Sequence, residues 1–433
     1  MAPPVSLSRR GFLAATGALV LGCGGRVRTS PPAASAAGAS PSSGQPSTEP
    51  AIRIGLAMGR PHLTFTARTG RYLIRESGSD EAIAVTAAGE QWSVISHARE
   101  GLRVRDPRGY LSLAHARPLR VEPVAGGAGL DVEEQLYPGA IEVRQDETGV
   151  TVVNELPLEE YLRGVLAREL PGRGHAPEAL KAQAVAARTY ALKRMGSRAA
   201  LGFDLFADTQ DQVYAGVGDA SPAADRALAD TRGRALLAGG NLIDAYYHST
   251  CGGSTASVEE AFPQPPVPYL VSVSDADGRR GFHCSSSRYF RWQAAYERDA
   301  LETIVTRNLG RFVTLPSGGP GDLRDLEVSE TSSTGRVTAL RVETTAGNFQ
   351  VARNDVRWLF ADGGSPGLRS TLFLLRGERQ RGEIRRVTLV GGGWGHGVGM
   401  CQVGAVGRAT AGAACEQILR HYYRGTHLER LYG

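Results

Sequence analysis

The sequence predicts an α+β fold, in which a mixed β-rich core carries a few helices that form a substrate cleft. Three observations support this class. Short segments of strand-forming residues fill the chain from Ala51 to about Thr151, the apolar periodicity becomes helical from Leu156 to about Met195, and strand-like segments then return. Because these segments do not alternate as regular strand–helix–strand units, a parallel βαβ architecture is not expected.

The composition is that of an ordinary globular protein. Hydrophobic residues make up 42% and charged residues 21% of the 433 residues, and this length suggests about two or three domains. The net charge of +5 is a mild excess that does not indicate a nucleic-acid partner, and none is expected. Of the 49 basic residues only Lys181 and Lys193 are lysines, and the other 47 are arginines. Because arginine is so strongly preferred, each of the two lysines is a candidate for a specific role.

Residues 1–23 resemble an export signal. Arg9 and Arg10 precede a short apolar run, which is typical of twin-arginine signals, and the residues that end at Cys23 resemble a lipoprotein cleavage box. The run is too short to span a bilayer, which takes roughly 20 residues. We therefore expect an extracytoplasmic protein, in the periplasm or cell envelope, that is anchored to the membrane by lipid on Cys23. The alternative is a plain signal peptide that is cleaved nearby.

The next two parts of the chain carry no motif with a chemical role. Residues 24–50 are rich in Pro, Ser and Ala and are expected to form a flexible linker. Residues 51–150 form an N-terminal β-rich part, with strands expected at 52–56, 63–66 and 141–143 and turns at Arg108-Gly109 and Gly126-Gly127. Within residues 151–433, strands are expected at 235–237, 243–247 and 337–343, and a final helix at 416–423.

The helix expected between Leu156 and Pro171 carries an acidic residue on its apolar face. The apolar stripe is formed by Leu158, Tyr161, Leu162, Val165 and Leu166. Glu169 lies near the middle of this stripe, where burial raises the pKa of a carboxyl group and the negative end of the helix acts in the same direction. Both effects suit a general acid that keeps its proton near neutral pH. The alternative is a frayed helix end at which Glu169 pairs with Arg168 or Arg173.

A second, alanine-rich helix is expected from about Pro177 to Lys193. Lys181 and Arg188 are seven residues apart and share one face of it, with small residues such as Ala184 between them. This face either approaches an anionic group or forms a solvated edge, and the rarity of lysine slightly favours the first.

Polar residues gather in a segment at the end of an expected strand. His248, Ser249, Thr250 and Cys251 follow one another there and are expected to border a site. His248 and Cys251 have a spacing compatible with metal ligation, and Cys284 is a candidate third ligand. Two other interpretations stay open: a Cys251–Cys284 disulfide, which the compartment permits, and free thiols. Cys401 and Cys415 have no assigned role.

Residues 391–402 form a glycine-dense segment. It lacks the Lys-Ser/Thr ending of a phosphate loop, which argues against nucleotide binding. Trp394 suits stacking on a sugar ring, and His396 and Gln402 suit hydrogen bonds to hydroxyl groups. A structural turn with a buried tryptophan is the alternative.

Together these segments resemble the stage II sporulation protein D family, also called SpoIID/LytB. The resemblance runs from Val153 to Tyr432, within a SpoIID-like catalytic region at 151–433. The matching segments are VNELPLEEYLRGVLARELP (153–171), EALKAQAVAARTYAL (178–192), DTQDQVYAG (208–216), AYYHSTCGGST (245–255), PYLVSV (268–273), GGGWGHGVGMCQVGAVGRA (391–409) and ILRHYYRGTHLERLY (418–432). They occur in the family's order, and together they are highly specific.

The resemblance implies a lytic transglycosylase of peptidoglycan. Such an enzyme cleaves the bond between N-acetylmuramic acid and N-acetylglucosamine in peptide-stripped strands and leaves a 1,6-anhydro end. Glu169 matches the family's catalytic glutamate and is expected to act as the single general acid/base. Substrate contacts are expected from Lys181, Arg188, Tyr214, His248, Ser249, Thr250, Trp394, His396 and Gln402. No cofactor is required, although some family members carry a zinc at a His/Cys cluster, which leaves a structural zinc open here.

Two other functions compete with this one. The name LytB is attached to modifiers or enhancers of a cell-wall amidase, so the cleft could grip glycan strands without cutting them and serve an amidase partner. A metal-dependent wall hydrolase built on His248 and the cysteines is disfavoured, because the sequence has no HExxH-like pair. Family resemblance does not imply sporulation, and a vegetative cell-wall role is at least as well supported.

Overall fold

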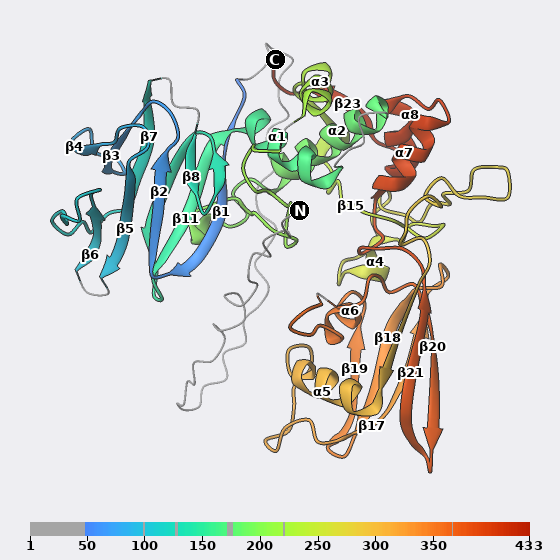
Figure 1. Cartoon of the computed structure of the whole chain (residues 1–433). Coiled ribbons are helices and arrows are strands. Elements are labelled where there is room, and N and C mark those ends of the chain that lie inside the picture. Colours follow the sequence, from blue (N-terminus) through green and yellow to red (C-terminus); the bar gives the residue numbers. More distant parts are fainter. Residues whose placement is uncertain (1–47, 98–99, 126–128, 171–175, 220, 366) are drawn as a thin grey trace, which may run out of the picture.

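The computed structural model (Figure 1) describes residues 48–433 except 98–99, 126–128, 171–175, 220 and 366. The expected signal at 1–23 with Cys23, nearly all of the linker and the turn Gly126-Gly127 lie outside the described residues. The fold is α+β and rich in strands, as the sequence predicts. Among the described residues no helix is long and apolar enough to cross a membrane.

The N-terminal part is built from two sheets that share one hydrophobic core. A seven-stranded sheet has the order β12-β1-β11-β10-β7-β3-β4, and a five-stranded sheet has the order β6-β5-β2-β8-β9. The strands are β1 Ala51–Arg60, β2 His62–Ala67, β3 Arg71–Glu76, β4 Ala82–Val85, β5 Gln91–His97, β6 Gly101–Arg105, β7 Leu119–Ala125, β8 Leu130–Val132, β9 Gln135–Tyr137, β10 Ala140–Gln145, β11 Val150–Pro157 and β12 Leu205–Phe206. Alternating apolar residues such as Ile52, Ile54, Leu63 and Phe65 point into the core, which confirms the strands expected in this part.

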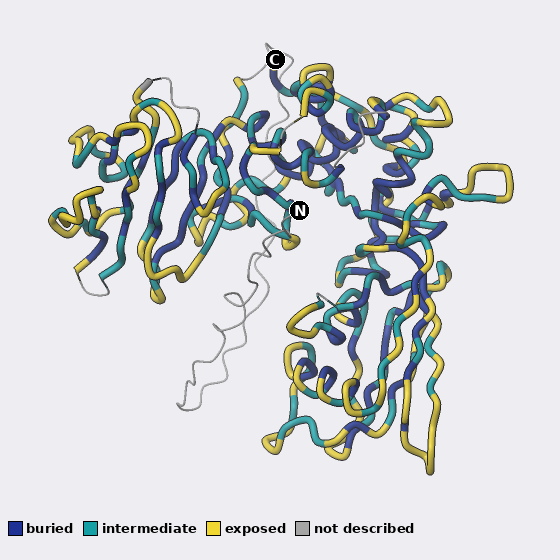
Figure 2. Tube along the Cα trace, viewed as in Figure 1, coloured by how far each residue is buried: buried dark blue, intermediate teal, exposed yellow. Residues whose placement is uncertain are grey.

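A group of helices follows, with α2 at its centre. Its elements are α1 Leu158–Glu169, α2 Pro177–Arg194, a 3-10 turn Ala199–Leu201, α3 Pro222–Asp230, β13 Arg234–Ala238, β14 Asn241–Leu242, β15 Tyr247–His248, β22 Met400–Cys401, α7 Gln402–Thr410, α8 Cys415–Tyr422 and β23 His427–Arg430. α2 packs against α1, α3, α7 and α8, and all of its alanines are buried, as the dark blue of Figure 2 shows. Small side chains allow this close packing on every side, so the end of the chain returns to the first two helices.

The helices expected from the sequence are confirmed with small changes at their ends. The first begins at Leu158, because Leu156 and Pro157 still belong to β11. The strand expected at 243–247 is wrong, since only Tyr247 lies in β15. The backbone of this segment bonds to several partners in turn, including the Leu236 carbonyl and the Met400 amide, instead of one neighbouring strand.

Residues 292–391 form a further unit with a hydrophobic core of its own, inside the region treated as one from the sequence. Its elements are β16 Trp292–Glu297, α5 Arg298–Leu309, β17 Leu323–Thr331, β18 Val337–Thr344, β19 Gly347–Ala352, α6 Asp355–Leu359, β20 Phe373–Gln380 and β21 Glu383–Gly391, and α4 Val258–Ala261 precedes it. The sheets have the orders β16-β21-β20 and β17-β18-β19. Figure 1 shows this unit extending away from the helices.

The glycine-dense segment carries the chain from this unit back to the helices. It lies against the segment that follows β15: Tyr247 pairs with Met400 and His248 with Cys401 in parallel register, and Thr250 pairs with Trp394. Gly395 has a φ of +114°, and a Cβ there would lie 2.7 Å from the Cβ of His248. The glycines therefore allow two irregular segments to approach closely, and this contact positions the candidate site.

Candidate active site

Glu169, the last residue of α1, lies where three segments meet. The side-chain amide of Gln402, the first residue of α7, donates a hydrogen bond to Glu169 Oε2 at 2.9 Å. The backbone N–H of Val213 donates to Oε1 at 3.4 Å. The Tyr247 side chain acts on the same carboxyl group and, like Gln402 and Val213, lowers its pKa. The side chain is closely surrounded but keeps partial access to solvent, as a group that reacts with a substrate requires.

The Tyr247 hydroxyl is held by a buried relay. Gln212 donates from Nε2 to this hydroxyl at 2.8 Å and accepts a hydrogen bond from the Tyr161 hydroxyl at 3.1 Å. The sequence reasoning missed Gln212, Val213 and Tyr247 as site residues. The signal that could have found them is their place inside two family-matching segments, 208–216 and 245–255.

Burial raises the pKa of Glu169, and the hydrogen bonds from Gln402, Val213 and Tyr247 oppose that shift only in part. Among the described residues, no cation forms an ion pair with its carboxyl group, since Arg168 pairs instead with Asp219 at 2.8 Å. Arg173 lies outside the described residues. The site thus holds an acid that keeps its proton to a higher pH than an exposed glutamate.

Asp211 is a second buried carboxylate in the same loop as Val213, and its oxygens are occupied. It pairs with Arg198 at 2.9 Å, accepts a hydrogen bond from the Tyr190 hydroxyl at 3.0 Å and accepts another from the backbone N–H of Phe206 at 2.9 Å. Asp211 therefore orders the loop and is not a free second acid.

The two basic residues expected at the cleft have other partners. Arg188 is fully buried and donates to both carboxylate oxygens of Glu159, at 2.8 and 2.7 Å. A side chain without solvent access cannot contact a glycan, so its expected substrate role is wrong. Lys181 pairs with Glu178 at 3.1 Å and Asp230 at 3.0 Å near the surface, which corresponds to the solvated edge.

Tyr214 also lies in the core and not in the cleft. Its hydroxyl donates to Asn154 Oδ1 at 2.9 Å, and its ring packs against those of Tyr137 and Tyr161. It is almost completely buried. The expectation of a sugar contact fails because Gly164 of α1 leaves room for this ring to pack inward.

His396 and His248 connect the two paired segments. His396 Nε2–H donates to the Tyr247 carbonyl at 2.9 Å, and Nδ1 accepts from the Val398 N–H at 3.1 Å. Burial lowers the pKa of His396 to about 3, so the ring is neutral and its nitrogens are occupied. His248 is buried with Nδ1 at 3.1 Å from the Val398 carbonyl. Both expected sugar contacts are therefore corrected to structural roles.

Ser249 and Thr250 differ in their access to solvent. Ser249 stays partly exposed beside β15. Thr250 is buried and donates to Ser287 Oγ at 2.8 Å, so it is corrected to a structural contact, because its hydroxyl is already satisfied inside the protein.

Comparisons with known proteins agree with this arrangement. A family model described as "Stage II sporulation protein" matches residues 146–237, which contain Glu169, Gln212 and Val213. An uncharacterized protein of Brachyspira hyodysenteriae is 31% identical over 64% of this chain and 68% of its own length. The stage II sporulation protein D of Bacillus subtilis is 28% identical over 71% of this chain and 83% of its own. This chain belongs to the SpoIID/LytB family.

Other similarities extend past the SpoIID match. The amidase enhancer of Bacillus subtilis is 29% identical over 62% of this chain, which spans 40% of the enhancer's length. Residues 276–399 match a domain of unknown function, DUF8618. Tyr247 and Gln402 lie outside the SpoIID match and still contact Glu169. The site around Glu169 is therefore completed by residues that follow the matched segment.

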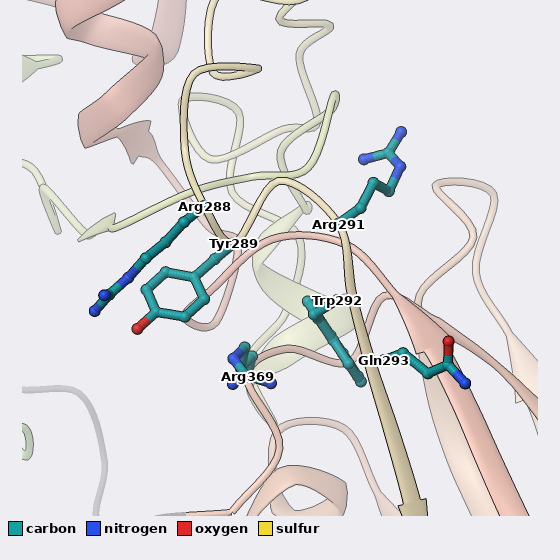
Figure 3. Close-up of a pocket in the computed structure, with 6 residues that line it drawn as sticks. All are labelled: Arg288, Tyr289, Arg291, Trp292, Gln293 and Arg369. Atoms are coloured by element: carbon teal, nitrogen blue, oxygen red, sulfur yellow. The ribbon is translucent and has the colours of Figure 1, made fainter.

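A pocket of about 390 Å³ lies beside the glycine-dense segment (Figure 3). It is lined by Arg288, Tyr289, Arg291, Trp292, Gln293 and Arg369. The guanidinium groups of Arg288 and Arg369 lie 4.6 and 5.2 Å from the Tyr289 ring centroid, whereas Arg291 points away from them in Figure 3. Trp394 is 38% exposed and meets the Tyr289 ring edge-on at 4.3 Å, which provides an accessible aromatic surface next to two cations.

Three cysteines and an aspartate form a buried cluster, and one of them, Cys401, directly precedes Gln402. The ligand atoms of Cys251, Asp275, Cys284 and Cys401 all lie within 4.8 Å of one another. The sulfurs of Cys251 and Cys284 are 3.5 Å apart and both cysteines are free, whereas a disulfide requires about 2.0 Å. His248 is not part of this cluster, so the expected set of His248, Cys251 and Cys284 is corrected: Asp275 and Cys401 take the place of the histidine.

Proposed function

We propose that this chain is a peptidoglycan lytic transglycosylase with Glu169 as its single general acid/base. Membership of the SpoIID/LytB family supports a cell-wall-related role. The observation that carries the finer proposal is the state of Glu169: a carboxyl group whose pKa is raised by burial, oriented by Gln402, Val213 and Tyr247, without an ion-paired cation among the described residues. A proton donor near neutral pH needs these properties.

The proposed reaction uses the same carboxyl group twice. Protonated Glu169 gives its proton to the oxygen that links N-acetylmuramic acid to N-acetylglucosamine, and the bond from the anomeric carbon to that oxygen breaks. The carboxylate then takes the proton of the muramic acid 6-hydroxyl, whose oxygen bonds to the anomeric carbon. The products are a 1,6-anhydro end and a free 4-hydroxyl, and no water is consumed.

One carboxylate is enough for this chemistry. Hydrolytic glycosidases use a second carboxylate as nucleophile or as base for water. The nearest alternative in the loop, Asp211, is paired with Arg198 and two further donors. An intramolecular attack by the substrate's own hydroxyl removes the need for a second carboxylate.

The pocket beside Trp394 suits an anionic glycan. Once the peptide is removed, N-acetylmuramic acid carries a free lactyl carboxylate, which Arg288 and Arg369 can pair with. Trp394 offers an aromatic face for a sugar ring. Tyr247, which contacts Glu169, is three residues from Thr250, which pairs with Trp394, so the backbones of Tyr247 and Thr250 are at most about 10 Å apart. Ser249, partly exposed, lies between them.

The location of the protein is part of this proposal. Its substrate lies outside the cytoplasm, so we expect export through residues 1–23 and retention at the membrane through lipid on Cys23. The linker at 24–50 would give the described part of the chain reach into the wall.

The second candidate function is that of a glycan-binding enhancer of a cell-wall amidase. The observation that favours it is the 29% identity to the Bacillus subtilis amidase enhancer. In this case the pocket beside Trp394 would hold glycan strands for the amidase, and Glu169 would not be needed.

Peptide-stripped glycan strands distinguish the two functions. We expect the wild type to release anhydromuramyl products, detected by mass spectrometry, and Glu169→Gln to reduce the rate about 10²–10⁴-fold. Glu160→Gln, on the same helix and in a surface ion pair with Arg163, is the matched control and should keep full activity. Full activity of a folded Glu169→Gln protein would refute the mechanism. Glycan binding without any anhydro product from the wild type would favour the enhancer.

The inactive Glu169→Gln protein also isolates binding from cleavage. Adding Arg369→Ala to it should weaken binding of peptide-stripped strands and make the remaining affinity less dependent on salt, because one cationic contact is lost. Neutral chitin oligosaccharides serve as the control ligand and should bind both proteins alike. Equal affinity of the two proteins for the charged strands would remove the pocket from the proposal.

A further inference from the structure

We infer that Cys251, Asp275, Cys284 and Cys401 bind one zinc ion, and that this ion fixes the segment from which Gln402 reaches Glu169. The two parts of this inference are separable. The metal site stands on the geometry of the cluster alone, whereas the link to catalysis rests on the proposed function.

The spacing of the cluster is that of a tetrahedral zinc site. With Zn–S distances of about 2.3 Å and Zn–O distances of about 2.0–2.2 Å, tetrahedral ligand atoms lie roughly 3.5–3.8 Å apart. Cys251 Sγ is 3.5 Å from Cys284 Sγ and 3.7 Å from Asp275 Oδ2, and all four ligand atoms lie within 4.8 Å of one another. A small cation therefore fits between them with little movement.

The four groups lie in a dry environment, where the three sulfurs and Asp275 Oδ2 face one another. Cys251, Cys284, Cys401 and Asp275 are each fully buried. They belong to or adjoin a core of apolar residues such as Val398. Arg408 and Tyr422 contact only Oδ1 of Asp275, so a cation bound to Oδ2 and the sulfurs would complete the pairing of the buried carboxylate.

Two arginines, the partly buried Arg408 and the fully buried Arg336, complement the charge of the proposed site. Three thiolates and a carboxylate around a divalent ion leave two net negative charges. Arg408 lies 3.3 Å from Asp275 Oδ1, and the fully buried Arg336 donates to the Cys251 carbonyl at 2.9 Å. Its Nη2 also donates to the Ser254 carbonyl at 3.1 Å, so a buried positive charge lies against the segment that carries Cys251.

An outer shell already orients the ligands. Asp275 Oδ1 accepts a hydrogen bond from the Tyr422 hydroxyl at 2.8 Å, which leaves Oδ2 facing the sulfurs. The backbone N–H groups of Cys251 and Gly404 both donate to Cys401 Sγ at 3.2 Å. Bonds of this kind stabilise and orient metal-bound ligands.

Gly404 shows how closely the backbone surrounds this site. A Cβ at this position would lie 2.5 Å from Asp275 Oδ2 and 2.3 Å from the Tyr422 hydroxyl. Only glycine allows the first turn of α7 to pack against the aspartate. The segment Cys401-Gln402-Val403-Gly404 thus supplies one ligand of the cluster, Cys401, and the glycine that lets α7 approach Asp275.

The ion would act on the active site through one peptide bond. Cys401 is followed directly by Gln402, whose amide holds Glu169 Oε2 at 2.9 Å. Cys401 also pairs with His248 in the ladder that presents Tyr247. A four-ligand site leaves no open coordination position for a substrate, so the role of the ion is structural and Gln402 is a positioning residue.

Metal analysis of the purified full-length protein tests the site directly. We expect close to one zinc per chain by mass spectrometry of the metal, and a zinc-edge X-ray absorption spectrum with mostly sulfur and some oxygen in its first shell. Neither measurement needs a variant that folds. A metal-free wild type from zinc-supplemented medium, a Cys251–Cys284 disulfide in the intact mass, or an imidazole-rich shell would each overturn the inference.

Variants assign the ligands. Cys284→Ser and Asp275→Asn should each lower the zinc content severalfold and weaken the thiolate-to-metal absorption after cobalt replaces zinc. Cys415→Ser is the matched control, because Cys415 is buried and free but lies outside the cluster. An equal loss of zinc in Cys415→Ser, or none in Asp275→Asn, would refute this ligand set.

The link to Glu169 has its own measurement, which does not depend on glycan cleavage. Chelation of zinc should move the NMR titration of the Glu169 carboxyl group to higher pH, because Gln402 no longer holds the carboxylate, and returned zinc should restore it. The Glu169→Gln protein assigns the signal. An unchanged titration in zinc-depleted, folded protein would refute the link and leave the metal site standing.

Discussion

Glu159 and Glu169 stand in the first and last turns of the same helix, α1, and the protein gives them opposite properties. Glu159 is buried against Arg188 and also accepts hydrogen bonds from the Tyr432 hydroxyl and the Gly233 N–H. Burial alone would raise the pKa of Glu159, but the bonds and charge of Arg188 outweigh it and lower the pKa. Glu169 has only neutral donors, and burial raises its pKa.

The comparison teaches that burial by itself does not decide what an acid does. A cation in contact converts a buried glutamate into half of a structural ion pair, whereas neutral donors leave it able to hold and release a proton. Arg188 thus stabilises the fold through its ion pair with Glu159. No described cation contacts Glu169 in the same way, which leaves that carboxyl group able to exchange a proton.

The largest expected effect comes from breaking the ion pair. Glu159→Gln leaves the Arg188 charge buried without its partner and should destabilise the protein by about 3–5 kcal/mol in chemical denaturation near neutral pH. Because the pKa of Glu159 is lowered in the fold, its contribution is present above the unfolded value near 4.5 and is lost as the pH falls through the folded value. Glu160→Gln, which breaks a surface pair, should cost less than about 1 kcal/mol. Equal costs would contradict the comparison.

An intermediate effect is expected from Gln402→Ala. Glycan cleavage by the wild type should decline as the pH rises through the raised pKa of Glu169, because the acid must be protonated to act. Loss of the Gln402 amide removes a donor that favours the carboxylate, so this decline should move to higher pH and the maximal rate should fall about tenfold. Gln210→Ala, an exposed neighbour of the site loop, should change neither. A decline that moves to lower pH would show that the amide does not act on Glu169.

The smallest effect is expected on the stability of Glu169→Gln. Since the folded pKa of Glu169 is raised, its favourable contribution is complete below the unfolded value near 4.5 and is lost as the pH rises through the folded value. A glutamine at this position cannot ionise, so the Glu169→Gln protein does not lose stability as the pH rises. Its thermal midpoint should exceed that of the wild type by a few degrees at neutral pH and match it in acid. A lower midpoint at neutral pH would mean that the ionised carboxyl group is stabilised, as in Glu159.

Much of α1 and α2 could be predicted because their information is local. The apolar stripe of α1 and the alanine-rich α2 both appear in the structure as expected. Glu169 was found because its place on the stripe is a matter of helical periodicity. Glu159 was missed by the same reasoning, because its burial depends on Arg188, Gly233 and Tyr432, which no periodicity connects.

The metal-ligand prediction shows the same limit. His248 and Cys251 were proposed as ligands because of their spacing in the sequence, and Cys284 was the candidate third ligand. In the fold the His248 ring bonds to the Val398 carbonyl, whereas Cys401, about 150 residues away, meets Cys251 at hydrogen-bond distance. Proximity in the chain therefore selected the wrong partner for Cys251.

The sequence by itself determined the α+β class, the helix that carries Glu169, and the SpoIID/LytB resemblance, because strand alternation, helical periodicity and family motifs are written within short stretches of chain. Only the tertiary structure decided that Arg188 is structural, that Gln402 and Tyr247 hold the acid, and that Asp275 and Cys401 join the other two cysteines. These outcomes depend on which distant groups share a dry interior, where each charge must find a partner, and no local pattern specifies that partner.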